Sequence, residues 1–147
     1  HHSSSDDLFS AIRSELTRND PAPTLQESNL SIQTAQSARQ ALKMAEDAAF
    51  SCIIADHRMP DMSGTELLLK FNDIQPDCER ILISDQITTS ELIYAVDSAH
   101  IFAFLNKPWN DFELKACIAL SLARRRMLME NRMLADMVEK SGHFLKP

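Results

Sequence analysis

Short apolar runs alternate with helical patterns along this chain, and this alternation restricts the fold more than any other feature. One run ends in Asp56, the next ends in Ser84, and a third leads to Lys107. The segments between them carry apolar residues at spacings of three and four, which is the pattern of amphipathic helices. Strands that alternate with helices of about ten residues imply right-handed crossovers and a parallel sheet. The sequence therefore predicts an α/β fold.

The predicted elements are placed by turn residues and by helix-capping signals. Ser37, Thr88 or Thr89, and Asn110 are expected to cap helices, because their side chains can accept hydrogen bonds from free backbone N–H groups. The predicted strands cover residues 30–35, 51–56, 81–84 and 101–105. The predicted helices cover residues 38–48, 65–72, 89–99 and 110–140, and an earlier amphipathic helix contains Leu8, Phe9, Ile12 and Leu16. The side chains expected to face the core are Ala41, Leu42 and Ala45, then Leu67, Leu68 and Phe71, then Leu92, Ile93 and Val96, and finally Leu114, Cys117, Ile118 and Leu122.

Composition argues against several classes of protein. With 147 residues, of which 44% are apolar, the chain is expected to form one globular domain with a short appendage. A net charge of −6 argues against direct nucleic-acid binding, and no apolar run reaches the roughly 20 residues that span a bilayer. No signal peptide is visible, and Cys52, Cys78 and Cys117 have no zinc or disulfide spacing, which favours a cytoplasmic location.

The polar residues at the strand ends form the candidate site. The carboxyl ends of parallel strands meet at one edge of the sheet, where ligands bind in open α/β sheets. Asp56, Ser84 and Lys107 would bring a carboxylate, a hydroxyl and an ammonium group to that edge, which suits a phosphoryl group. Gly64 follows Asp56 by eight residues and precedes a predicted helix. A glycine there indicates that the backbone takes a positive φ or passes close to another group.

From about Leu8 to Leu122 the chain resembles the receiver domain of bacterial two-component response regulators. The most specific stretches are residues 53–68, where Asp56 is followed by Met-Pro at +3 and +4 and by glycine at +8, and residues 104–109, Phe-Leu-Asn-Lys-Pro-Trp. The resemblance implies a flavodoxin-like, doubly wound, five-stranded parallel sheet of order 2-1-3-4-5 with an extended C-terminal helix. The Lys-Pro-Trp ending resembles receivers that precede an output domain. We therefore expect a receiver domain at residues 1–123 and, at residues 124–147, a helical linker toward an output domain that is absent from this chain.

The resemblance also implies a role for each site residue. Asp56 would accept a phosphoryl group from a phosphohistidine of a sensor kinase or phosphotransfer protein, while Lys107 and Ser84 would contact the phosphoryl oxygens. Phe104 occupies the position of the family's switch residue. Mg²⁺ would be held by Asp56, by the backbone carbonyl of Arg58 and by an acidic pair. The expected protein is a phosphoacceptor with at most self-catalysed phosphotransfer and autodephosphorylation, not an enzyme.

The N-terminal segment departs from the family pattern. The family's first strand is missing, because residues 1–5 have no strand pattern. Either residues before Ser3 are absent from this sequence or a segment of another chain fills the slot, since a gap would leave buried backbone groups without partners. Asp6 and Asp7 have the chemistry of the metal-binding pair. In an alternative register the pair falls at Ser3 and Ser4, and the two aspartates only cap the following helix.

The residues near the predicted phosphoacceptor also differ from the family pattern. Asp85 follows Ser84 where the family has a small residue, so its carboxylate would repel a phosphate unless it turns outward or helps to hold the cation. Arg58 and Gln86 would flank the site and could change the rate at which water removes the phosphoryl group. His57 has no nucleophilic partner in the sequence and is interpreted as a surface turn residue. An alternative remains open, a pseudo-receiver that binds or dimerises without phosphorylation.

The final predicted helix is longer than a domain of this size needs. In its second half, residues repeat every seven positions at Cys117, Arg124, Asn131 and Val138, with Leu120, Met127 and Leu134 between them. One interpretation is a solvated helix end. The other is a coiled-coil stem in a homodimer, with Asn131 fixing the register. The expected partners are a histidine kinase, an output domain and a second copy of the chain, with no direct contact to nucleic acid or to a membrane.

Overall fold

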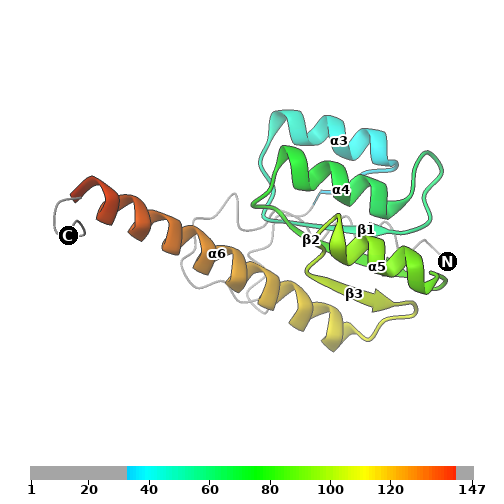
Figure 1. Cartoon of the computed structure of the whole chain (residues 1–147). Helices are drawn as coiled ribbons and strands as arrows, with labels where there is room; N and C mark the ends of the chain where they lie inside the picture. Colours follow the sequence, from blue (N-terminus) through cyan, green and yellow to red (C-terminus); the bar gives the residue numbers. More distant parts are fainter. Residues whose placement is uncertain (1–32, 142–147) are drawn as a thin grey trace.

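The computed structural model describes residues 33–141. The predictions for Asp6, Asp7 and the helix near Leu8 lie outside that range. Figure 1 shows that the described part is a small sheet with helices on both of its faces. Its strands are β1 (Cys52–Asp56), β2 (Glu79–Ser84) and β3 (Ala103–Asn106), and its helices are α3 (Ala38–Asp47), α4 (Gly64–Ile74), α5 (Thr89–Asp97) and α6 (Asp111–Ser141).

The three described strands are parallel and lie in the order β1-β2-β3. Asp56 on β1 lies opposite Ile83, and Ser84 on β2 lies opposite Asn106 on β3. The predicted α/β class and the parallel pairing are confirmed. The strand predicted at residues 30–35 is wrong for residues 33–35, which form no strand and have no neighbouring strand within the described range. Its first three residues lie outside that range.

The core has two layers, one on each face of the sheet. Ile53 and Ala55 point to the face covered by α3, α4 and α5, whereas Cys52 and Ile54 point to the face covered by α6. All five residues of β1 are buried. A strand covered on both faces needs a continuous apolar run, which explains why residues 52–55 show no alternation of polar and apolar side chains.

Side-chain caps fix the ends of the helices. Ser37 accepts a hydrogen bond from the backbone N–H of Gln40 (3.1 Å), and Asn110 accepts from Phe112 (2.7 Å) and Glu113 (3.2 Å), as predicted. The structure begins α4 at Gly64, one residue earlier than expected, because Ser63 caps it. The same helix ends at Ile74 instead of Asn72. Capping residues are local signals, so these boundaries are close to the predicted ones.

Helix α5 faces the sheet with a different side from the predicted one. Ile93 and Val96 were expected in the core but are 54% and 51% exposed, whereas Ala95 is fully buried. The buried side is formed by Ala95 and by Ala99, which lies just after the helix. The half-buried Leu92 lies beside them. Small side chains let α5 approach the sheet closely, and the larger apolar residues are left on the outer side.

Helix α6 crosses the second face of the sheet and extends well beyond it (Figure 1). Ile118 and Leu122 are buried against the sheet, as predicted. Further along, Arg124 donates two hydrogen bonds to the buried carboxylate of Glu79 (2.9 and 2.8 Å), and Arg132 donates two to Asp77 (3.1 and 2.7 Å). Within residues 33–141 no helix combines the length and the apolar character that crossing a bilayer requires.

One residue of the predicted seam on α6 does not fit a contact with a partner helix, and the seam itself stays a prediction. Cys117 is buried against the sheet and is not available to a partner helix, whereas Arg124 is bound to Glu79 with its side chain still 52% exposed. Leu120, Met127 and Leu134 are exposed by 62%, 62% and 58%. By helical geometry, the residues that complete this outer stripe are Ala116, Ala123, Glu130 and Met137.

All three cysteines are buried and carry free thiols. Burial raises the pKa of Cys52 to about 12 and that of Cys117 to about 11. Burial also holds the pKa of Cys78 well above its usual value. The three side chains therefore remain protonated at neutral pH and act as small apolar residues of the core.

Candidate functional site

Asp56 ends β1 at the carboxyl edge of the sheet. The residue is 4% exposed, and its Oδ1 accepts a hydrogen bond from the backbone N–H of Arg58 (3.0 Å). Gly64 lies directly against the Asp56 backbone, where a Cβ atom would be 2.2 Å from the Asp56 carbonyl oxygen. Glycine is thus required at position 64, because the backbone there passes too close to the Asp56 backbone for any Cβ atom. The buried carboxylate stands at the start of a tight loop that only glycine can close.

Lys107 supplies the opposite charge. Its ammonium group contacts Oδ2 of Asp56, although the two residues are far apart in the chain. The backbone N–H of Lys107 donates to the carbonyl of Ser84 (3.0 Å), which places Lys107 beside the end of β2, and the Lys107–Pro108 bond is cis. The expected proximity of Asp56 and Lys107 is therefore present in the structure. A charge-assisted contact of this kind, largely screened from water, is stronger than a surface ion pair.

Ser84 lies at the same edge but its hydroxyl makes local contacts. The residue is fully buried, donates to the carbonyl of Gln86 (2.8 Å) and accepts from the N–H of Gln86 (3.0 Å). Strand pairing places it one strand away from Asp56, since Asp56 lies opposite Ile83. All three predicted site residues thus end neighbouring strands at one edge, with Ser84 turned toward its own loop.

Two loops meet above the site. Arg58 follows β1 and donates to the side-chain oxygen of Gln86, which follows β2 (2.6 Å). Both residues line an open hollow together with His57, residues 59–63 and Glu91. Asp85 is exposed. Its carboxylate is therefore solvated, and its repulsion of an incoming anion is weaker than that of a buried charge.

Phe104 lies in the middle of β3 and is half-buried. It packs against the core on the face of α3, α4 and α5, in the same cluster as Leu82 and Ala99. Its position fits the predicted switch residue, but the rotation of its ring stays a prediction.

His57 was interpreted as a surface turn residue, and this was wrong. It is only 9% exposed, its Nδ1 lies 3.2 Å from the hydroxyl oxygen of Thr65, and its Nε2 lies 3.5 Å from the carboxylate of Glu91. Thr65 belongs to α4 and Glu91 to α5. In the structure Thr88 and Glu91 form a capping box, and no sequence signal connects that box to His57.

The role of Asp61 was also not predicted from the sequence. Its carboxylate accepts hydrogen bonds from the backbone N–H groups of Arg39 (2.9 Å) and Ala38 (3.2 Å) at the start of α3. The hydrogen bond from Arg39, followed by that from Ala38, holds the pKa of this carboxyl group below its usual value. The loop after Asp56 is therefore attached to α3 by a charged cap.

The oxygen atoms around Asp56 suit Mg²⁺ in part. Its carboxylate and the carbonyl of Arg58 are hard oxygen ligands, and Mg²⁺ keeps several waters, so few protein ligands are needed. The proposed pair Asp6 and Asp7 lies outside the described range. Within residues 33–141 alone, no cluster of three or more histidine, cysteine or acidic side chains could enclose a metal ion.

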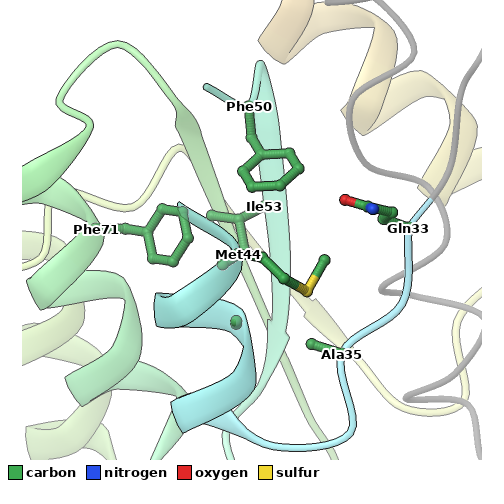
Figure 2. A pocket seen from close by; sticks show the side chains of 7 residues that line it. Gln33, Ala35, Met44, Phe50, Ile53 and Phe71 are labelled. Carbon is green, nitrogen blue, oxygen red and sulfur yellow. The ribbon is translucent and has the colours of Figure 1, made fainter. Parts of the chain in front are cut away.

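An apolar pocket between α3 and β1 is not a ligand site. Figure 2 shows Met44, Phe50, Ile53 and Phe71 around it, with Gln33 at its side. Its volume of about 10 Å³ is at the limit for one water molecule, and a small ligand needs far more room. We interpret it as a packing gap in the core.

Comparison with known proteins decides the family. The family model described as response regulator receiver domain matches residues 14–119. The chain belongs to this family. The receiver domain is 28% identical over 110 residues to the hydrogenase transcriptional regulatory protein HoxA of Bradyrhizobium diazoefficiens, covering 74% of this chain and 23% of HoxA. It is 33% identical over 76 residues to the transcriptional regulatory protein FixJ of Rhizobium meliloti, covering 52% of this chain and 37% of FixJ.

Solved structures agree on the fold. The signal receiver domain of an HD domain-containing protein from Pseudomonas fluorescens Pf-5 superposes with a TM-score of 0.68 at 25% identity, covering 72% of this chain and 78% of that one. A CheY-like receiver domain protein from Methanospirillum hungatei JF-1 gives 0.66 at 25% identity, with coverages of 70% and 82%. This receiver domain therefore has the CheY-like α/β fold, and it spans less than half of either regulator named above.

Proposed function

We propose that this receiver domain accepts a phosphoryl group on Asp56 from a phosphohistidine of a sensor kinase or phosphotransfer protein. One observation carries the proposal, the contact between the buried Asp56 carboxylate and the Lys107 ammonium at the carboxyl edge of the sheet. An acid that only capped a turn would not need a cation brought from a distant strand. On this proposal the domain is a cytoplasmic phosphoacceptor and catalyses no reaction on a separate substrate.

In the transfer step, a carboxylate oxygen of Asp56 bonds to phosphorus while the P–N bond of the donor histidine breaks. The departing imidazole nitrogen keeps the bonding electron pair and takes up a proton. Lys107 then moves from Oδ2 of Asp56 to a phosphoryl oxygen, so the cation stays beside the negative charge. Catalysis of phosphoryl transfer depends mainly on such positioning and charge neutralisation.

Asp56, the carbonyl of Arg58 and the predicted pair Asp6 and Asp7 would hold Mg²⁺. When bound, the ion supplies further neutralisation of the phosphoryl oxygens. The Arg58 N–H already orients Oδ1 of Asp56, which leaves less rearrangement for the reaction.

The conformational response begins at Ser84. To donate to a phosphoryl oxygen, its hydroxyl must leave the carbonyl of Gln86. The phosphoryl group carries about −1.5 to −2 of charge in place of the single charge of the Asp56 carboxylate, and its acceptor oxygens favour that exchange. The loop after β2 then moves toward the site, and Phe104 turns into the space that the loop vacates. This is a shift between two states that both exist before phosphorylation.

We also propose the sheet order 2-1-3-4-5, with β1, β2 and β3 as its third, fourth and fifth strands. Support comes from β1, which is buried at all five positions although it pairs only with β2 within residues 33–141. A strand buried in that way needs hydrogen-bonding partners at both edges. Further strands on the other side of β1 would supply them.

The output side of the proposal concerns α6. HoxA and FixJ are named transcriptional regulatory proteins, and this chain covers less than half of each. By analogy, an output domain continues from α6, and two copies pair through its outer stripe of Leu120, Met127 and Leu134. Seven-residue spacing of exposed Leu and Met residues suits a helix–helix seam. The buried Cys117 is excluded from that seam.

Intact-protein mass spectrometry after incubation with acetyl phosphate and Mg²⁺ tests the phosphoacceptor role. The wild type should gain the mass of one phosphoryl group, and Asp56→Asn should gain none. Asp85→Asn is the matched control, because it removes a neighbouring exposed carboxylate and should label normally. No mass gain in the wild type, together with no Mg²⁺-dependent change in Trp109 fluorescence, would instead support a pseudo-receiver. Equal labelling of Asp56→Asn and wild type would refute the assignment of the acceptor.

A further inference from the structure

The backbone of His57 is fixed at a junction of three elements. It follows Asp56 directly, its backbone N–H donates to the carbonyl of Ile83 on β2 (2.8 Å), and its carbonyl accepts from the N–H of Gly64 at the start of α4 (2.9 Å). Its side chain is only 10% exposed. The imidazole is therefore held by a backbone that cannot move without disturbing β1, β2 and α4.

The ring has a distinct partner on each side. Nδ1 lies 3.2 Å from Oγ1 of Thr65, and Nε2 lies 3.5 Å from Oε2 of Glu91. A carboxylate can only accept, so the favourable tautomer carries its proton on Nε2. Nδ1 then accepts the Thr65 hydroxyl proton, and the Nε2 proton faces the Glu91 carboxylate. The other tautomer would direct a lone pair at the carboxylate.

Glu91 is the part of α5 that the ring contacts, and it also caps that helix. One of its carboxylate oxygens accepts from the backbone N–H of Thr88 (2.9 Å), while the Thr88 hydroxyl accepts from the N–H of Glu91 (3.1 Å). The other carboxylate oxygen faces His57. The imidazole is thus connected to the capping turn that fixes where α5 begins.

We propose that His57 is a positioning residue that holds the first turn of α5 against the phosphoacceptor loop and opposes its displacement. This rests on the proposed function, because the displacement in question follows phosphorylation of Asp56. Ser84 ends β2 and Thr88 immediately precedes α5, so a short connection joins the two residues. A Ser84 hydroxyl drawn toward a phosphoryl group pulls on the capping turn, and the His57–Glu91 contact resists that pull. The contact therefore sets the balance between the resting and the displaced loop.

Three substitutions separate this role from simple packing. His57→Gln can place a side-chain N–H near the position of Nε2 and keep the bond to Glu91. His57→Asn reaches only the position of Nδ1, so it keeps a partner for Thr65 and loses Glu91. Glu91→Gln keeps the capping box, since Gln caps as Glu does, but removes the charge. Glu91 is on the surface, so this variant should fold even if a change at His57 does not.

The first measurement is amide hydrogen exchange of α5 in the full chain without a phosphodonor. His57→Asn and Glu91→Gln should each speed exchange of the α5 amides about 2- to 5-fold, the size of one partly exposed contact, with α4 amides unchanged. The double variant should be no faster than the faster single variant, and His57→Gln should stay near wild type. The proposal would be overturned if the increases in α5 exchange rate of the two single variants multiplied in the double variant. It would also be overturned if both single variants exchanged at the wild-type rate.

The second measurement repeats the exchange after acetyl phosphate and Mg²⁺. If Asp56 is labelled, exchange of the α5 amides should change at a lower degree of phosphorylation in His57→Asn than in the wild type, because the contact that opposes displacement is missing. Identical responses would count against a role in the switch. A wild type that does not label refutes the proposed function instead, and the first measurement still decides whether the contact holds α5.

Discussion

Replacing Gly64 by alanine should destabilise the domain and disturb the site at the same time. The new Cβ atom would lie 2.2 Å from the Asp56 carbonyl oxygen, 2.7 Å from the Asp56 carbonyl carbon and 3.0 Å from Cα of His57. The preferred separation of such non-bonded atoms is about 3.5 Å, so the two backbone segments must separate by roughly 1 Å. All the clashing atoms are backbone, and no side-chain rotation can relieve the clash.

The cost of such overpacking is about 3 kcal/mol, the upper part of the usual range, which corresponds to a fall in Tm of roughly 10 °C for a domain of this size. Thermal unfolding followed by circular dichroism measures it. Ser63→Ala at the adjacent position is the matched control, because it removes only the cap on the N–H of Glu66 and should cost about 1 kcal/mol. Acetyl phosphate labelling of Gly64→Ala at a temperature where it is folded should be slower than wild type. A Tm equal to that of Ser63→Ala would refute the close-approach argument.

Three further predictions concern other parts of the chain. Backbone N–H donors from Arg39 and Ala38 lower the pKa of Asp61, so its stabilising effect is complete above the ordinary value of 3.8 and is lost as pH falls through the lower, folded-state pKa. Denaturant unfolding of Asp61→Asn should therefore show lower stability than wild type at pH 7, with a gap that closes in acid; a constant gap would contradict the charged cap. Burial raises the pKa of Cys52 to about 12, so a thiol reagent at pH 8 should label Cys52 only after unfolding, and rapid labelling of the native protein would contradict its burial. If two copies pair through α6, Met127→Glu should shift sedimentation toward the monomer, whereas the same change at the exposed Met129, outside the stripe, should have less effect.

Local signals made part of the fold predictable. The apolar run ending in Asp56 and the capping residues Ser37 and Asn110 act within a few positions of themselves, so their elements were placed within about two residues. The association of Asp56 with Lys107 was predictable because parallel strands end at one edge of a sheet. Gly64 stood out because glycine is rare in this chain.

The errors concern contacts between elements that are distant in the sequence. Helical periodicity showed that α5 is amphipathic but did not show that its alanines, not Ile93 and Val96, would face the sheet. The seven-residue spacing on α6 did not reveal that Arg124 would be bound by Glu79. His57 was misassigned because its two partners come from different helices. In each case the three-dimensional neighbour decides the role, and a single sequence does not identify that neighbour.

The attachment of α6 has a geometric consequence. Arg124 and Arg132 are bound to Glu79 and Asp77, at and just before the start of β2, and the two arginines are about 12 Å apart along the helix axis. A helix that is bound at two separated points cannot rotate about either point. The direction of α6 up to Ser141 therefore follows that of β2, and a small tilt of β2 becomes a larger lateral displacement at the described end of the helix.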